Sequence, residues 1–360
     1  MKNTLGTSVS VTLFGESHGA KIGAVLDGLA PGIPIDEALI AAQLEKRRPA
    51  GAISTARRER DAFEIVSGVF EGKTTGTPLA ILIPNEDIRS GDYTRGALRP
   101  GHADYTAHVK YHGFEDYRGG GHFSGRITAA LTAAGAVAIG ALRGKGIEIG
   151  THILRCAGIQ DAPFTDPAVQ IPVLNGMVFA VLDSAKGEAM RAAAEAAAKA
   201  GDSVGGVLET MVTGLPAGVG EPWFDTLESM LAHALFAIPA VKGVEFGGGF
   251  ALADMKGSEA NDAFALRDGR IVTKTNHNGG ISNGMPVCFR CAVKPTPSIA
   301  LAQDSVDAEG TREETLTLKG RHDPAIVHRA RVVADSVTAL VLCDALALRY
   351  GTDWLRRDAE

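Results

Sequence analysis

The chain has 360 residues and carries 36 Lys and Arg against 42 Asp and Glu, a formal net charge of −6. This acidic balance argues against binding of nucleic acid or an anionic membrane through overall charge, so any anion site must be local. Hydrophobic residues at 45% and charged residues at 22% are typical of globular proteins and exclude a disordered, collagen-like or coiled-coil chain. At this length we expect one large unit or two packed domains with a sizeable core.

The apolar periodicity predicts strands and helices that come in blocks. Period-2 segments predict strands, and longer segments with helical periodicity predict helices. Asp36 and Asp323 are expected to cap the first and last of these helices. Because strands and long helices do not alternate regularly along the chain, this order favours an α+β fold over a regular βαβ alternation. In chain order we expect strands over residues 9–14 and 22–26, a helix over 36–46, strands over 63–69 and 79–83, a helix over 127–143, a strand over 147–153, a helix over 185–200, strands over 206–212, 243–250 and 287–293, and a helix over 324–350.

Two short phrases indicate an internal similarity. Residues 27–34 (Asp-Gly-Leu-Ala-Pro-Gly-Ile-Pro) and 213–220 (Thr-Gly-Leu-Pro-Ala-Gly-Val-Gly) each follow an apolar strand, which suggests two structurally similar halves. The first residues contain no apolar signal region. The uncharged runs at 127–142 and 167–182 are interrupted by Thr, Gly, Pro or Asn and fall short of the roughly 18 residues of a membrane span. We therefore predict a cytoplasmic protein with no membrane partner.

The four cysteines, Cys156, Cys288, Cys291 and Cys343, are too few and too scattered for a disulfide framework. A strand would place Cys288 and Cys291 on opposite faces, and no second pair completes a zinc site, so we predict buried thiols and no metal. Residues 67–74 fall one residue short of a P-loop, and no glycine triplet completes a GxGxxG fingerprint. A nucleotide cofactor would therefore bind in another way.

Two turns place histidines where they could act chemically. Residues 14–19 end a predicted strand in a glycine-bounded turn that projects Ser17 and His18 from a sheet edge. A second turn puts His102 between the guanidinium of Arg99 and the carboxylate of Asp104, neighbours that can tune an imidazole for proton transfer. The alternatives are a solvated histidine at position 18 and a histidine held in a structural turn at position 102.

Arginine is the second recurring feature. A guanidinium group binds phosphate and carboxylate bidentately, so arginines beside turn residues indicate an anion site. The alternative is a solvated charged face that nearby carboxylates neutralise. The arginines concerned are Arg47, Arg48, Arg57, Arg58, Arg60, Arg99, Arg126 and Arg321, and the carboxylates are Glu45, Glu59, Asp61 and Glu64.

Two further segments suit an anion. Residues 119–121 are three consecutive glycines before Ser124 and a long helix, which exposes backbone N–H groups. In the segment that starts at Lys294, two prolines stiffen the backbone, and alternation places Lys294, Thr296 and Ser298 on one face.

Eight motifs, in order over nearly the whole chain, together carry a specific resemblance. They are residues 15–19 (Gly-Glu-Ser-His-Gly), 99–104 (Arg-Pro-Gly-His-Ala-Asp), 116–121 (Asp-Tyr-Arg-Gly-Gly-Gly), 201–206 (Gly-Asp-Ser-Val-Gly-Gly), 240–245 (Ala-Val-Lys-Gly-Val-Glu), 280–284 (Gly-Ile-Ser-Asn-Gly), 294–298 (Lys-Pro-Thr-Pro-Ser) and 320–324 (Gly-Arg-His-Asp-Pro). One such motif could arise by chance, but eight in register are not plausibly so. By these motifs the chain resembles the chorismate synthase family.

The resemblance implies a fold and a reaction. The family fold is a helical layer sandwiched between two antiparallel β-sheets, an α+β architecture, which here implies a single domain over residues 1–360 and an assembly as a homotetramer. The implied reaction is the last step of the shikimate pathway, a carbon–oxygen lyase reaction in which 5-enolpyruvylshikimate 3-phosphate loses phosphate by 1,4-trans elimination and gives chorismate. Reduced FMN is the implied cofactor. It would come from an external flavin reductase or from NADPH, and it is not consumed.

The resemblance also implies residue roles. His18 would protonate the departing phosphate, His102 would supply a proton to the reduced flavin, and Asp323 would assist deprotonation. The implied substrate-binding residues are Ser17, Arg47, Arg48, Arg99, Arg126 and Arg321. The implied flavin contacts are Arg47, His122, Phe123, Ser124, Ala240, Gly279, Lys294, Pro295, Thr296, Pro297, Ser298 and Arg321.

This chain departs from the family pattern in the glycine-rich turn. Many members have Arg-Ser where this chain has His122 and Phe123, so an imidazole replaces a guanidinium and a phenyl ring replaces a hydroxyl. Flavin affinity is expected to differ as a result. Two alternative functions stay open at this point: a flavin-free phosphate-ester lyase or transferase, and a phospholigand-binding or RNA-binding module that uses the same arginines.

Overall fold

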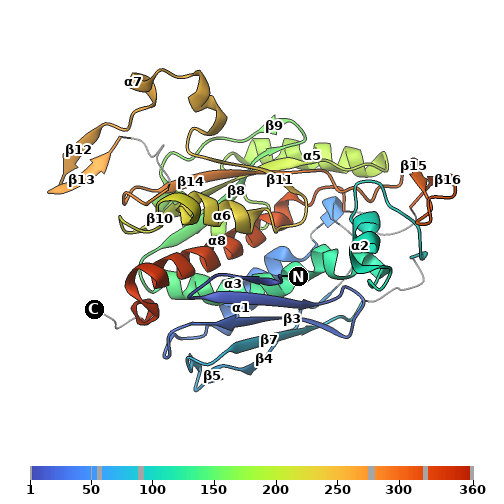
Figure 1. The fold of residues 1–360 in the computed structure, drawn as a ribbon. Coiled ribbons are helices and arrows are strands. Elements are labelled where there is room, and N and C mark those ends of the chain that lie inside the picture. Colours follow the sequence, from blue (N-terminus) through green and yellow to red (C-terminus); the bar gives the residue numbers. More distant parts are fainter. Residues whose placement is uncertain are drawn as a thin grey trace.

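A layer of helices lies between two five-stranded antiparallel sheets (Figure 1). The computed structural model of the chain describes residues 2–49, 51–54, 59–87, 93–274, 280–318 and 323–356. The arrangement confirms the predicted α+β class and the predicted sandwich of a helical layer between antiparallel sheets.

Sheet one is built from the N-terminal part of the chain. Its strand order is β1-β2-β3-β7-β4, and each neighbouring pair is antiparallel. Ile22 lies opposite Ile83 and Leu26 lies opposite Leu79, so these apolar side chains share one face, and they are buried under the helices. The strands are β1 (Thr4–Leu5), β2 (Ser10–Gly15), β3 (Lys21–Asp27), β4 (Glu64–Ser67) and β7 (Leu79–Pro84).

Sheet two has the order β11-β14-β10-β8-β9 and is also antiparallel. Its inner face meets the helices through apolar residues and a polar cluster: Thr151 Oγ1 lies 2.7 Å from Thr210 Oγ1 and donates to Asp335 Oδ1 at 2.6 Å. Cys291 is buried on this face, and Cys288 lies on the opposite face, as predicted, but Cys288 is only half-buried because it lies on the outer face of the sheet. The strands are β8 (Glu148–Cys156), β9 (Ile159–Gln160), β10 (Gly206–Thr213), β11 (Val241–Phe246) and β14 (Val287–Val293).

Three helices form the layer between the sheets: α1 (Glu37–Arg47), α3 (Thr128–Arg143) and α8 (Val327–Tyr350). The helices α3 and α8 approach closely at Gly135, where an added Cβ would lie 2.2 Å from Ser336 Cβ. Both helices are almost entirely buried, because each is covered by a sheet on one side and a helix on the other.

One helical stretch, Gly125–Arg143, is long and apolar enough to cross a membrane by length and composition, which corrects the expectation that this run is too short. In the fold, 83% of the apolar window is buried inside the protein. Its apolar character is that of a core helix, since α3 packs against α8 and sheet one.

Shorter elements surround this sandwich. The two-stranded sheet β12-β13 projects from the far side of sheet two, and β15-β16 lies beside α2 (Figure 1). The helices are α2 (Asp104–Tyr111), α4 (Pro167–Gly176), α5 (Ser184–Lys199), α6 (Leu227–Leu235) and α7 (Gly257–Ala260), and the strands are β5 (Val69–Phe70), β6 (Lys73–Thr74), β12 (Phe264–Arg267), β13 (Arg270–Thr273), β15 (Gln303–Val306) and β16 (Glu313–Leu316). The 3-10 turns are η1 (Gly51–Ile53), η3 (Arg118–Phe123), η4 (Gly125–Ile127), η5 (Trp223–Asp225), η6 (Gly249–Asp254) and η7 (Thr352–Leu355).

The predicted strands and helices are all present, with shifted ends. Asp36 caps α1 as expected, since its side chain accepts from the Leu39 amide. The last helix begins three residues later than predicted, and its N-cap is Ile326, because the Asp323 carboxylate binds Arg329 instead of the helix amides. The strand predicted over 243–250 ends at Phe246, because glycines with positive φ follow it.

Candidate active site

A turn of three glycines brings the two predicted catalytic histidines together. Gly119, Gly120 and Gly121 all have positive φ and form part of η3, between α2 and α3. A Cβ added to Gly119 would lie 2.4 Å from His18 Cε1, and one added to Gly120 would lie 2.7 Å from His102 Cε1. Only glycine fits at these two positions, because each imidazole packs directly on the backbone.

His18 lies in the tight turn that follows β2. The residue is 7% exposed, and its ring packs edge-on against Tyr93, with the ring centroids 5.1 Å apart. The Ser17 amide donates to the Gly121 carbonyl at 3.0 Å, which ties this turn to the glycine turn. Asn85 Nδ2 donates to the carbonyls of Glu16 and Gly19 and closes the turn from the other side.

His102 lies between a guanidinium and a carboxylate, as predicted. Its Nδ1 is 2.7 Å from Asp104 Oδ1, and Arg99 donates to both oxygens of the same carboxylate. Burial raises the pKa of Asp104, but hydrogen bonds from Arg99 and His102 outweigh burial and hold this pKa well below its usual range. An ionised Asp104 favours a proton on Nδ1 and leaves Nε2 as the exchangeable nitrogen.

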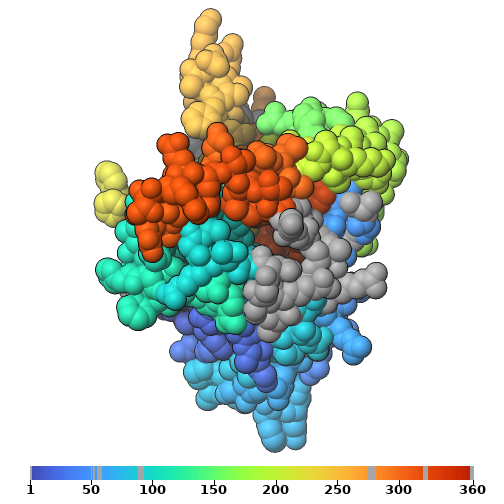
Figure 2. Space-filling model, turned by 90° about the vertical axis from the view of Figure 1, so that its right-hand side faces the viewer, coloured from blue at the N-terminus to red at the C-terminus, as the bar shows by residue number. Residues whose placement is uncertain are grey.

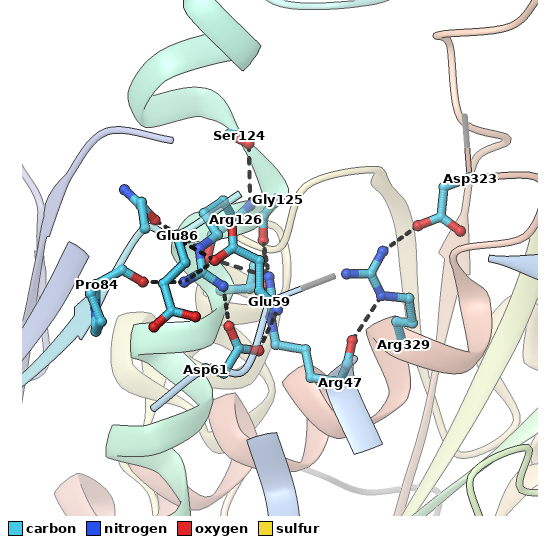
Figure 3. A network of polar contacts seen from close by, with 12 residues as sticks. Arg47, Glu59, Asp61, Pro84, Glu86, Ser124, Gly125, Arg126, Asp323 and Arg329 are labelled. Carbon is cyan, nitrogen blue, oxygen red and sulfur yellow. Dashed lines mark hydrogen bonds and ion pairs between the residues drawn. The ribbon is translucent and has the colours of Figure 1, made fainter. Parts of the chain in front are cut away.

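A buried network of arginines and carboxylates continues from the His18 turn (Figure 3). Arg126 Nε donates to Asn85 Oδ1 at 2.9 Å, Nη2 donates to the Pro84 carbonyl at 3.0 Å, and Nη1 binds Asp61. Glu59 lies 3.5 Å from the same guanidinium group. Arg126 is therefore fixed on all sides by protein groups.

Arg47 extends this network toward Asp323 (Figure 3). Its Nη1 lies 3.3 Å from Asp61 Oδ2, and its backbone carbonyl accepts from Arg329 Nε at 2.8 Å. Arg329 in turn binds the Asp323 carboxylate. Hydrogen bonds thus run without a break from the His18 turn to Asp323.

The alternative considered from the sequence, that nearby carboxylates neutralise the arginines, holds for Arg47 and Arg126. Asp61 is 3% exposed and binds both Arg47 and Arg126, whereas Glu64 pairs with Lys21. With Glu59 also beside Arg126, two buried carboxylates balance the charge of the two guanidinium groups. Direct contact of either arginine with a substrate anion stays a prediction.

Three of the predicted binding or catalytic residues carry buried polar atoms with no hydrogen-bond partner among the residues that the structure describes. They are Arg48 Nε, Thr296 Oγ1 and Asp323 Oδ1. A buried donor or acceptor without a partner is costly and uncommon in folded proteins. Such atoms at three predicted site residues indicate positions where a bound ligand would complete the hydrogen bonds.

The segment from Lys294 to Ser298 packs against the His102 turn. Lys294 Nζ donates to the Gly101 carbonyl at 2.6 Å, and the Lys294 amide donates to the Ala240 carbonyl at 2.9 Å. A Cβ on Gly101 would lie 3.1 Å from Pro297 Cβ. Lys294 therefore holds the turn that carries His102, and Ala240, with φ +75°, lies directly behind it.

A cavity of about 1470 Å³ opens beside these groups. Figure 2 looks onto the face of the molecule formed by α2 and the β15-β16 sheet, both of which contribute to its lining. Tyr93, Arg99, His102, His122 and Phe123 are among the lining residues. Tyr93 lines the cavity, and His18 packs against it without being a lining residue itself.

The departures in the glycine-rich turn also lie at this cavity. His122 Nδ1 is 2.8 Å from the Gly15 carbonyl, to which it donates, and Phe123 packs edge-on against Tyr111 with centroids 5.9 Å apart. Ser124 Oγ accepts from the Arg126 amide at 3.2 Å. Two predicted site residues, Gly279 and Arg321, lie outside the described residues, as do Arg57 and Arg58.

Sequence reasoning named Asp61 as a carboxylate that could neutralise the arginines, but it missed Asn85 and Arg329. These two residues join the parts of the site, yet neither belongs to a motif or to an apolar period. Their partners lie 41 and 282 positions away in the chain. Only the fold brings these pairs together, so local spacing carried no signal for them.

Known proteins are similar to this chain over almost its whole length. A chorismate synthase of Methanocella arvoryzae is 46% identical over 351 residues, which are 96% of this chain and 94% of that protein. One of Thermococcus kodakarensis is 45% identical, covering 98% of this chain and 99% of that protein. A solved structure described as a crystal structure of chorismate synthase matches with a TM-score of 0.77 and 27% identity, over 98% of this chain and 95% of that chain.

The fold, the anion-suited site and these matches define a carbon–oxygen lyase that acts on phosphates. The family model for chorismate synthase matches residues 9–347. The chain belongs to the chorismate synthase family.

Proposed function

We propose that the chain converts 5-enolpyruvylshikimate 3-phosphate to chorismate by 1,4-trans elimination, with reduced FMN bound beside the substrate. The allylic carbon–oxygen bond to phosphate breaks, C6 loses a hydrogen, and a new carbon–carbon double bond forms. Membership of the family supports this reaction. When bound, reduced FMN supplies electron density transiently, with no net redox change.

One observation supports the proposal most directly: Arg48, Thr296 and Asp323 each carry a buried polar atom with no partner in the described part of the chain. Thr296 belongs to the segment that packs on the His102 turn, Asp323 is linked through Arg329 to Arg47, and Arg48 is the next residue. The substrate carries a phosphate and two carboxylates, and FMN carries a second phosphate, so a guanidinium nitrogen and a hydroxyl are suitable donors. The cavity of about 1470 Å³ also exceeds the roughly 300–1,000 Å³ of a typical single-ligand pocket. This volume favours two ligands bound together.

Each of the three catalytic groups would handle a proton. His18 would protonate the departing phosphate, and the Gly119 contact holds its ring in place. When protonated on both nitrogens, His102 would give the Nε2 proton toward the flavin and keep the Nδ1 proton that faces Asp104. Asp323 would assist deprotonation through Oδ1, the oxygen with no partner in the described part of the chain, because its other oxygen binds Arg329.

The remaining predicted residues would bind the two ligands. We infer that substrate anions meet Ser17, Arg47, Arg48, Arg99, Arg126 and Arg321. We infer that flavin meets Arg47, His122, Phe123, Ser124, Ala240, Gly279, Lys294, Pro295, Thr296, Pro297, Ser298 and Arg321. Reduced flavin would come from an external flavin reductase or from NADPH, and we expect a cytoplasmic homotetramer.

The test is anaerobic phosphate release from the substrate with FMN and dithionite. The wild type should release phosphate only when FMN is present, and activity without FMN would favour a flavin-free lyase. His18→Ala, His102→Ala and Asp323→Ala should each lower turnover by roughly 10²-fold or more, the size expected for general acid–base groups. Near-normal turnover in any one of them would refute the role of that residue.

A further inference from the structure

Two neighbouring side chains at the start of α8, His328 and Arg329, each bridge the same two segments. One segment comprises Arg47 at the end of α1 and the turn at residues 51–54, and the other is the lead-in to α8 at residues 323–325. Each side chain makes one hydrogen bond to each segment. We call His328 and Arg329 together the double clamp.

The contacts of His328 fix its protonation. The residue is 1% exposed, and Nδ1 lies 2.7 Å from the Ala325 carbonyl, which can only accept, so Nδ1 carries the proton. Nε2 of the neutral ring then accepts from the Ser54 hydroxyl at 2.8 Å. Burial lowers the pKa of His328 to about 4, although the charge of Asp323 acts in the opposite direction. The ring also stacks on Phe179, with centroids 6.2 Å apart.

Arg329 completes the double clamp on the next residue. Its Nε donates to the Arg47 carbonyl at 2.8 Å, and Nη1 binds Asp323 (Figure 3). The position of Asp323 relative to Arg47 therefore depends on how closely the two segments lie. Arg329 alone does not fix that separation, because its long side chain can follow either segment.

We propose that His328 is a positioning residue for Asp323, which it keeps in place by locking Ser54 to the lead-in of α8. This inference rests on the catalytic role proposed above for Asp323. A short, rigid imidazole between the Ser54 hydroxyl and the Ala325 carbonyl sets the distance between the two segments. A misplacement of about 1 Å at a catalytic group can cost on the order of 10²-fold in rate.

The test compares single and double variants of the full chain. His328→Asn removes the bond to Ser54, and Ser54→Ala removes the same bond from the other side with less disturbance of the core. Each should lower kcat by about tenfold and leave the substrate KM within about twofold, since Asp323 acts on chemistry and not on binding. In an Asp323→Ala background, His328→Asn should cause little further loss of kcat. His233→Asn, on the exposed face of α6, is the control and should leave kcat unchanged.

The outcomes separate this inference from the proposed function. If Asp323→Ala itself keeps near-normal kcat, the catalytic role of Asp323 fails. If Asp323→Ala is impaired and His328→Asn multiplies that loss by its full factor, the positioning role is wrong. A change in melting temperature with unchanged kcat in Ser54→Ala would also overturn it. Hydrogen exchange gives an independent readout, because backbone amides of residues 51–54 should exchange faster in Ser54→Ala and unchanged protection would count against the clamp.

Discussion

Asp104 is the residue on which the orientation of His102 depends. It accepts from Arg99 through both oxygens and faces the Nδ1 of His102, and its pKa is held low, so it stays ionised at any pH used for assay. We predict that Asp104→Asn lowers kcat by about tenfold or more, because an amide can present its NH2 group to Nδ1 and allow the ring to turn. Anaerobic phosphate release measures this effect.

The control for this substitution is Asp183→Asn. Asp183 caps α5, and asparagine caps a helix about as well as aspartate, so turnover should not change. Equal turnover in the Asp104→Asn variant and the wild type would contradict the orienting role of Asp104.

How far the site could be predicted from sequence depends on the distance between partners along the chain. His102, Arg99 and Asp104 lie within a few positions, so their grouping was predictable from the motif. Asn85 and Arg329 bind partners that only the fold brings close, and no local pattern marks them. A motif gives a residue type at a position, but its distant hydrogen-bond partner comes from tertiary packing.

His328 makes the stability of the protein depend on pH in a definite direction. Burial lowers its pKa from 6.5 to about 4, with Asp323 opposing this shift and Arg329 and Arg331 adding to it. Between these two values the unfolded chain binds more protons, so stability falls as the pH drops from about 6.5 to about 4. The loss from this one group is at most about 3 kcal/mol.

We predict that urea unfolding at pH 7 and pH 4.5 shows this difference. The wild type should lose about 2 kcal/mol more of its unfolding free energy between these pH values than His328→Asn, because asparagine does not titrate. Other groups titrate equally in both proteins, so the comparison isolates His328. Identical pH slopes for the two proteins would show that the ring is not held neutral by the fold.

At the scale of elements, the glycine turn η3 is the part that aligns the two histidines. We predict that Gly119→Ala and Gly120→Ala each lower kcat strongly, by about 10²-fold, because the new methyl group would displace His18 or His102. Gly72→Ala is the matched control: it has a similar positive φ of 70°, but its Cβ would meet nothing within 4 Å. It should cost about 1 kcal/mol of stability and no activity. Phosphate release and thermal unfolding of the three variants check both effects.

The helix boundaries show where a local sequence pattern predicts a cap correctly and where a tertiary contact overrides it. Asp36 caps α1, as the sequence indicates, because no nearby cation competes for its carboxylate in the described contacts. Asp323 has the same local signature, but Arg329 binds it and the helix starts at Val327. The sequence predicted that the backbone N–H groups of the three glycines, residues 119–121, would bind an anion. The structure shows that their lack of side chains also serves to admit two imidazoles, a contact that sequence spacing does not encode.

At the scale of the whole molecule, the contact between α3 and α8 holds both sheets on one helical layer. We predict that Gly135→Ala destabilises the protein by about 1–3 kcal/mol, because its Cβ would overlap Ser336. Gly140→Ala on the same helix is the control, since its Cβ would lie 3.8 Å from Leu39 Cδ2 and alanine favours a helix. Calorimetry should show one transition in each protein, shifted down only in Gly135→Ala. Two separate transitions would contradict the single domain over 1–360, which is still a prediction.

The similarity of the two halves also stays a prediction at this scale. The related phrases at 27–34 and 213–220 follow β3 and β10, which are the central strands of sheet one and sheet two. Each phrase leads to a helix, α1 or α6. Sequence reasoning could find this pair because both turns are local. It could not pair the strands into sheets, because strand order depends on contacts between distant segments.

The central place of α8 has a consequence for synthesis of the chain. Asp344 on this helix accepts hydrogen bonds from the amides of Thr7, Ser8 and Val9, at the entrance to β2. The helix α3 can cover sheet one early in synthesis, but sheet two packs mainly on α8, so the apolar inner face of sheet two lacks this cover until translation has passed residue 350. The nascent protein should therefore depend on chaperones until very late, and then complete its core in one concerted step.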